Sequence, residues 1–164
     1  MEQHAARYYH RVEGNNQLVG YTRCALGDGA AQAAFGDSLR LIYSPVLAEL
    51  RSGDVLCLPL GWQAQGTPPA NSSVYVHLAD AQGRPWAQSD GAPVNGLRPL
   101  ETLAPDEWLA DPRALLVPTD IPAGEYRLLV GVYARDDGRR MRVTTGASLE
   151  SDSVVCGTVR VEPN

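Results

Sequence analysis

Short apolar runs separated by turn-forming residues are the feature that most constrains the fold of this 164-residue chain. Gly, Pro, Asn and Asp cluster at 66–71, 90–93, 122–124 and 136–138. Many short strands with turn signals at this spacing are typical of β-sandwiches and barrels. The expected strands are 18–24, 38–43, 55–62, 73–80, 85–90, 113–117, 125–133, 140–143 and 153–161.

Alternation within these runs predicts two packed sheets rather than one. In the run 73–80, Val74, Val76 and Leu78 fall on one side and are expected to face the core. Tyr75 and His77 then fall on the opposite face, because successive side chains of a strand point to opposite sides.

The fold class follows from this pattern. Pro59 cannot donate to a strand ladder, so the run 55–62 is expected to lie at an edge or to bulge there. Weak helical character is expected only at 30–34 and 46–50. We predict an all-β protein, a two-sheet antiparallel β-sandwich of jelly-roll or immunoglobulin-like type, with about eight or nine strands. Residues 33–164 form this domain, and residues 1–32 form an N-terminal extension with one candidate strand.

Composition excludes several function classes. The formal net charge is −5 and the arginines form no basic stripe, which argues against nucleic-acid binding. No run approaches the ~18 apolar residues of a membrane span. The first residues lack the apolar segment of a signal peptide, which predicts a cytoplasmic protein if Met1 is the native start.

The cysteines are Cys24, Cys57 and Cys156, an odd number without a CxxC pair. This spacing favours neither a disulfide framework nor a zinc site. Cys57 and Cys156 lie in strand-like runs, where we expect free, buried thiols.

Six segments together carry a family resemblance. They are FGDSLRL at 35–41, LRSGDVL at 50–56, LGWQA at 60–64, VYVHLADAQGRPWAQSDGAPVNG at 74–96, PAGEYRLLVGVY at 122–133 and VCGTVRV at 155–161. In this order they resemble the C-terminal β-sandwich domain of large bacterial membrane proteins of the glycosyltransferase 39, or protein mannosyltransferase-like, type. The resemblance implies an extracytoplasmic accessory domain, since the catalytic acids of that family belong to its membrane part.

Four acidic residues, Asp80, Asp90, Asp106 and Glu107, are candidates for catalysis. His77 and Asp80 are three residues apart on a strand, so they point to opposite faces, and Asp80 opens a turn that its carboxylate can cap. Asp90 with Asp106 or Glu107 could serve as the two carboxyl groups of a small glycoside hydrolase. Their turn contexts already explain them, and we predict no catalytic residue, metal ligand or cofactor.

The aromatic residues are the stronger functional candidates, because aromatic rings give sugar rings a flat amphipathic surface on which to stack. The alternative is that each ring is half-buried packing. Trp108 belongs to the same group of aromatics. The predicted ligand-binding residues are Trp62, Tyr75, His77, Trp86 and Tyr133.

The sequence thus predicts a non-catalytic accessory or binding domain. Its expected partner is a carbohydrate or a membrane-embedded transferase region, and its expected location is extracytoplasmic if the chain is part of a membrane protein. Two alternatives remain open at this point: a structural module that packs on a membrane partner, and the small glycoside hydrolase.

Overall fold

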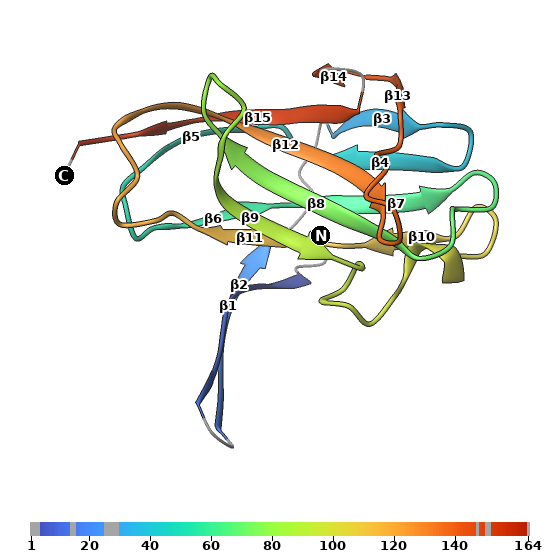
Figure 1. Ribbon diagram of the computed structural model, residues 1–164, viewed down its shortest axis with the longest axis horizontal. Coiled ribbons are helices and arrows are strands. Elements are labelled where there is room, and N and C mark those ends of the chain that lie inside the picture. The colour runs from blue at the N-terminus through green and yellow to red at the C-terminus, as the bar shows by residue number, and fades with distance from the viewer. Residues whose placement is uncertain (1–3, 14–15, 25–29, 147, 150–151, 164) are drawn as a thin grey trace.

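The computed structural model describes residues 4–13, 16–24, 30–146, 148–149 and 152–163. Nearly all regular structure in these residues is β, and the one helical element among them is the 3-10 turn η1, Leu100–Thr102. Two large sheets face each other and enclose a shared core (Figure 1). The predicted two-sheet β-sandwich is confirmed. In the part of the chain that is described, no helix is long and apolar enough to cross a bilayer.

The first large sheet has five antiparallel strands in the order β10-β7-β4-β3-β13. Its strands are β3 Ala31–Phe35, β4 Leu39–Tyr43, β7 Leu60–Ala64, β10 Trp108–Ala110 and β13 Val143–Thr145.

The second large sheet has six strands, with β14-β15-β12-β8-β9 in order and β5 paired in parallel to β15. Two of its long strands, β8 and β12, lie side by side in its middle and face the viewer in Figure 1. Its strands are β5 Val46–Leu50, β8 Ser72–Ala79, β9 Pro85–Gly91, β12 Gly124–Ala134, β14 Ser148–Leu149 and β15 Ser153–Val161.

The core lies between the inner faces of these two sheets. Val74, Val76 and Leu78 of β8 are fully buried there, which confirms the predicted register of that strand. Tyr126 enters the same core from β12, and its hydroxyl donates to the carbonyl of Pro122 at 2.6 Å. This bond fixes the turn before β12 in the manner of a tyrosine corner.

Pro59 divides one predicted strand into two, β6 Val55–Leu58 and β7. Strand β7 pairs with β10, whereas β6 pairs with β11, Arg113–Leu116. The partner strand is interrupted in the same way, between β10 and β11. The missing N–H of proline therefore breaks the ladder at the position that the sequence predicted.

The prediction of helical character at 30–34 and 46–50 is wrong. Residues 31–35 form β3 and residues 46–50 form β5. Both segments pair with a neighbouring strand, β3 with β4 and β5 with β15, and these tertiary pairings override a weak local preference.

The N-terminal region forms a hairpin of two strands, β1 His4–Glu13 and β2 Asn16–Cys24, where the sequence predicted one. Its far end extends away from the sandwich (Figure 1). At the near end Cys24 forms a disulfide with Cys57 of β6, with Cα atoms 6.0 Å apart. The expectation of unpaired cysteines is thus wrong for this pair, because the fold joins residues 33 positions apart. Cys156 is free and buried, as expected.

Candidate functional site

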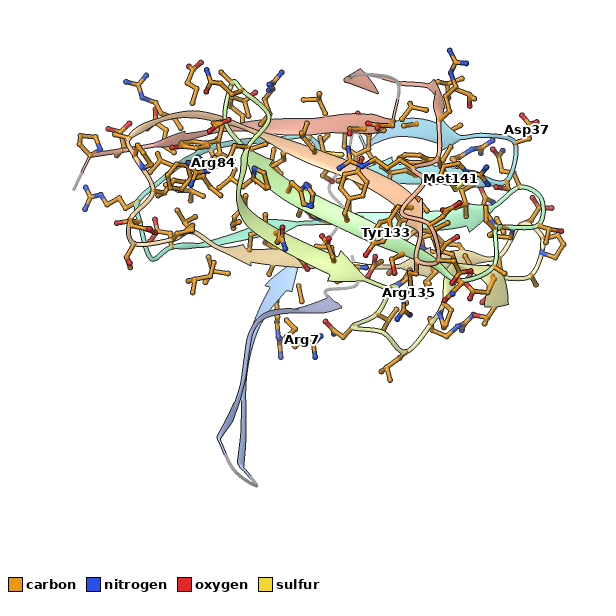
Figure 2. The ribbon with its side chains drawn as sticks, viewed as in Figure 1. Arg7, Asp37, Arg84, Tyr133, Arg135 and Met141 are labelled. Carbon is orange, nitrogen blue, oxygen red and sulfur yellow. A yellow bond between two sulfur atoms is a disulfide. The ribbon has the colours of Figure 1, made fainter. Side chains whose placement is uncertain are left out.

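Three of the predicted ligand-binding residues come together on the outer face of the six-stranded sheet. Tyr75 and His77 lie on β8, and Tyr133 lies beside them on β12. The ring centroids of Tyr75 and His77 are 4.8 Å apart, and those of Tyr75 and Tyr133 are 6.3 Å apart. Figure 2 shows Tyr133 on this face, near Arg135.

Tyr75 is the buried centre of this group, with only 2% of its surface exposed. A Cβ atom at Gly131 would overlap the Tyr75 ring, so the glycine leaves the space in which that ring lies. The Tyr75 hydroxyl pairs with the Ser153 hydroxyl at 2.8 Å and donates to the Asp152 carbonyl at 3.0 Å. The Arg140 guanidinium covers the Tyr75 ring, 4.7 Å from its centroid. Burial raises the pKa of Tyr75 above its ordinary value. Tyr75 supports its neighbours rather than presenting a free surface.

His77 faces Asp90 of β9, not Asp80. Its Nε2 lies 3.3 Å from Asp90 Oδ1, within ion-pair distance. The two atoms do not meet hydrogen-bond geometry, and this buried Nε2 has no hydrogen-bond partner among the described residues. We treat the pair as a close polar contact, because a separation alone does not make a hydrogen bond.

Asp80 holds the turn, as the sequence predicted. Its Oδ1 accepts the backbone N–H groups of Gln82 and Arg84 at 3.0 and 2.9 Å. Its Oδ2 accepts the indole N–H of Trp86 at 3.1 Å, and the Arg84 guanidinium lies 4.6 Å from the centre of that ring. Trp86 therefore lies at the start of β9, bonded to the β8–β9 turn, and is not part of the Tyr75 group.

The prediction that Trp62 binds a ligand is wrong. Trp62 is fully buried between the sheets, where it contacts Phe35 and where its indole N–H donates to Asp111 at 3.2 Å. Because its strand alternation places it inward with Leu60 and Ala64, no ligand on the surface can stack on it.

A surface pocket of about 430 Å³ lies beside the Tyr75 group, where β8, β9 and β12 meet the loops around them. Tyr133 supplies an aromatic wall and Asp90, Glu101 and Arg135 supply charges. Asn71 completes the rim: its backbone N–H donates to Glu101 Oε1 at 3.0 Å, and its side-chain amide donates to Asp136. Residue 71 has a φ of 58°, in the left-handed region that Asn tolerates better than most residues.

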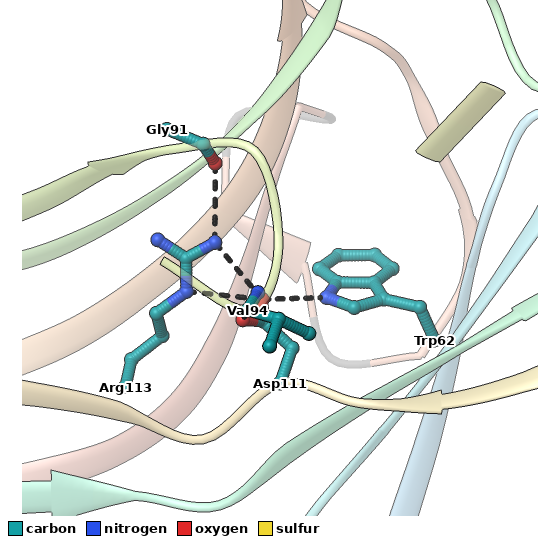
Figure 3. Close-up of polar contacts among 5 residues, drawn as sticks. All are labelled: Trp62, Gly91, Val94, Asp111 and Arg113. Atoms are coloured by element: carbon teal, nitrogen blue, oxygen red, sulfur yellow. Dashed lines mark hydrogen bonds and ion pairs between the residues drawn. The ribbon is translucent and has the colours of Figure 1, made fainter. Parts of the chain in front are cut away.

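A buried polar network fixes the loop that forms another wall of this pocket (Figure 3). Asp111 Oδ2 accepts from Trp62 Nε1 and from Arg113 Nε at 3.0 Å, and Asp111 Oδ1 accepts the Val94 N–H at 2.8 Å. Arg113 also donates to the Gly91 carbonyl at 3.1 Å. Val94 is held with a φ of 54°, which is strained for a β-branched residue.

This network was not predicted from the sequence. The spacing Asp-Pro-Arg at 111–113 was the available signal, since a short chain segment with opposite charges can pair locally. Nothing in the sequence shows that Trp62, 49 positions away, and the 91–94 loop meet the same carboxylate.

The carboxyl groups considered for hydrolysis do not share this pocket. Asp90 lines it, whereas neither Asp106 nor Glu107 does. Glu107 accepts the Ala104 N–H at 2.8 Å and an Arg98 guanidinium hydrogen at 2.6 Å, and these bonds lower its pKa. Glu107 is therefore used by its own loop. In the described part of the chain, no three His, Cys, Asp or Glu side chains are grouped to hold a metal ion.

Comparison with known proteins gives little beyond this geometry. No protein-family model matches the chain, and no curated protein matches it either. Among solved structures, the chain is similar to the crystal structure of a Niemann-Pick type C2 protein from the Japanese carpenter ant. The TM-score is 0.42 at 10% sequence identity, over 82% of this chain and 96% of that one.

Proposed function

We propose that this protein is a non-catalytic binding domain whose pocket beside Tyr133 takes a saccharide unit. The observation that carries the proposal is the composition of that pocket: one aromatic ring stands next to carboxylate, guanidinium and amide groups around a volume of about 430 Å³. Ligand pockets of this size combine an apolar surface with a few directed polar groups.

The chemistry of a sugar matches these groups. The C–H face of a pyranose ring can pack against the Tyr133 ring, which presents an apolar body with a polar tip. Sugar hydroxyls can donate to the carboxylates of Asp90 and Glu101 and accept from Arg135. Backbone and side-chain bonds already hold Asn71 and Glu101 in place, so little further ordering is needed on binding.

Buried hydrogen bonds hold the residues beneath and beside the pocket, which supports a binding role. Tyr75, beside the aromatic wall of Tyr133, is hydrogen-bonded to Asp152 and Ser153. The Asp111 network holds the loop around Val94 that forms another wall. A preorganised site loses less conformational entropy when it binds its ligand.

Titration calorimetry with a panel of glucose-, mannose- and galactose-based hexasaccharides tests this proposal. Tyr133→Ala should weaken binding by about tenfold or more, because it removes the stacking ring. Tyr133→Phe is the matched control, since it keeps the ring and should stay close to the unchanged protein. Equal affinity in all three proteins would refute a site at Tyr133. Hydrolysis of a hexasaccharide that is lost in Glu101→Gln would refute the non-catalytic part.

The Cys24–Cys57 disulfide bears on where in the cell this protein works. We infer an extracytoplasmic domain associated with a glycosyltransferase 39-type membrane protein, and the Cys24–Cys57 disulfide supports the extracytoplasmic part. Disulfides form and persist mainly in oxidising compartments. Non-reducing mass spectrometry of the protein isolated from its native cells measures the pair directly, and two free thiols at these positions would count against this location.

A second candidate, a structural module that packs on a membrane partner, is favoured by one observation. Leu47 on the edge strand β5 is 91% exposed. If this edge contacts a transferase region, Leu47→Lys should abolish co-purification with it while leaving saccharide binding unchanged. Retained co-purification would exclude this edge as the contact.

A further inference from the structure

Trp108 presents an aromatic surface outside the pocket, which it does not line. It lies on β10, the edge strand of the five-stranded sheet, and 42% of its surface is exposed. Its neighbour Leu109 pairs with the buried Trp62, so alternation places Trp108 on the outer face of this sheet.

Gly61 of β7 makes room for the Trp108 indole. A Cβ atom at Gly61 would overlap the six-membered part of the ring, so the indole lies directly over the glycine backbone. Glycine weakens a strand interior and often marks a place where another group approaches closely. Here the approaching group is an aromatic ring that is held against the sheet and still open to solvent.

Planar polar side chains continue the surface from Trp108 across the sheet. Gln63 is the cross-strand partner of Trp108, and Arg40 of β4 is the cross-strand partner of Gln63. Arg40 donates to Gln63 Oε1 at 3.4 Å, and Gln63 Nε2 donates to the Asp106 carbonyl at 3.3 Å. These bonds align an amide and a guanidinium beside the indole.

We propose that Trp108, Gln63 and Arg40 form a second saccharide-binding surface, separate from the pocket beside Tyr133. Adjacent strands are ~4.8 Å apart, so the row from β10 to β4 spans ~10 Å, the length of about two linked pyranose rings. One ring stacks on the Trp108 indole, and the hydroxyls of the next ring accept from Arg40 and pair with the Gln63 amide.

The arrangement favours a sugar over a protein partner. A protein interface core is depleted in charge, whereas Arg40 and Gln63 sit next to the aromatic ring. Its one aromatic ring stands at the edge strand β10. A sugar chain presents alternating C–H faces and hydroxyl edges, which match one ring followed by planar hydrogen-bonding groups.

The test is a titration of the ¹⁵N-labelled protein, followed at the three tryptophan indole N–H signals by NMR. The probes are cellohexaose, xylohexaose and mannohexaose. The Trp108 signal should shift saturably with at least one of them at a Kd of about 1 mM or lower, while the buried Trp62 signal stays still. Absence of a saturable Trp108 shift with all three probes would overturn the proposal.

Two variants separate this surface from the first site. Trp108→Phe should weaken binding at this surface severalfold, and Gly61→Ala should weaken it about tenfold by displacing the indole while leaving every polar group in place. Tyr133→Ala should leave the Trp108 shift unchanged, so failure of the pocket and failure of this surface are distinguishable. Leu116→Ala removes an exposed side chain elsewhere and is the control. A Trp108 shift that survives Gly61→Ala with unchanged affinity would also overturn the proposal.

Discussion

Asp111 is a single carboxylate that joins three parts of the chain. It is 1% exposed and binds the indole of Trp62, the guanidinium of Arg113 and the backbone of Val94. Buried charges are tolerated only when they are paired and hydrogen-bonded, and both oxygens of this carboxylate are used. The residue therefore connects the sandwich core to the loop that lines the pocket.

Removal of this carboxylate should be costly. Asp111→Ala leaves the buried Arg113 charge and the Trp62 N–H without their partner, and we expect a loss of about 3–5 kcal/mol in the free energy of unfolding. Urea denaturation measures it, with the exposed Asp120→Ala as control. The double variant Asp111→Leu/Arg113→Met should recover part of the loss, since no unpaired charge remains. A loss below about 1 kcal/mol in Asp111→Ala would contradict this role.

Asp80 makes the stability of the protein depend on pH. Burial acts to raise the pKa of its carboxyl, but hydrogen bonds from Arg84, Trp86 and Gln82 outweigh burial and hold the pKa below its ordinary value of 3.8. Because the folded pKa is the lower one, the stabilisation is complete above the unfolded value and is lost as the pH falls through the folded value.

Asp80→Asn should accordingly lower the melting temperature near neutral pH and have less effect in acid. The difference between the two proteins should narrow as the pH falls from about 5 to about 2. Thermal melts across this range measure it, with Asp120→Asn as the matched control. A difference that is constant across the range would show that the charge of Asp80 has no part in it.

At the scale of elements, the N-terminal hairpin depends on a covalent link. A two-stranded hairpin is at best marginally stable alone. Its near end packs Ala6 and Cys24 against Ala114 in a small cluster apart from the main core, and the Cys24–Cys57 disulfide crosses to β6. The disulfide thus fixes the hairpin where apolar burial is small.

Loss of the disulfide should release the hairpin before the sandwich unfolds. For a sequence separation of 33 residues, loop-closure entropy gives an upper estimate of about 3–4 kcal/mol. In Cys24→Ser/Cys57→Ser, trypsin should cleave within residues 4–24 at conditions that leave residues 31–161 intact. Reductant should have the same effect on the unchanged protein and none on the variant. Equal cleavage rates with and without the bond would show that the hairpin is held by other contacts.

For the whole molecule, the two proposed binding surfaces lie on the outer faces of opposite sheets. Residues on separate surfaces without shared partners act independently. A hexasaccharide recognised by both should therefore bind at two sites per chain, and calorimetry should give one site in Trp108→Ala or in Tyr133→Ala. The loss of binding free energy in the double variant should equal the sum of the losses in the two single variants to within about 0.5 kcal/mol. A strong departure from additivity would point to one shared site.

Local patterns in the sequence were enough for some features of this molecule. The alternation of Val74, Val76 and Leu78 predicted the inward face of β8, because side-chain direction in a strand depends only on position along it. Pro59 predicted the break between β6 and β7, and Asp80 predicted its own turn, since both effects arise within a few residues.

Other features required the tertiary structure, because they join residues that are distant in sequence. The pairing of β8 with β9 sets His77 opposite Gln88, so that its ring reaches Asp90 two residues along the same strand. The approach of β2 to β6 joins Cys24 to Cys57. Trp62 could be read from the sequence as either a ligand-contacting or a core residue. The packing of the second sheet and the buried Asp111 decided in favour of the core.

The sequence by itself determined that this chain forms a β-sandwich and which side of its central strand faces inward, because strand formation and alternation are local properties. Only the tertiary structure decided which aromatic rings reach the surface and what stands beside them. That outcome depends on strand register and sheet packing, where a shift of one residue moves a side chain to the other face.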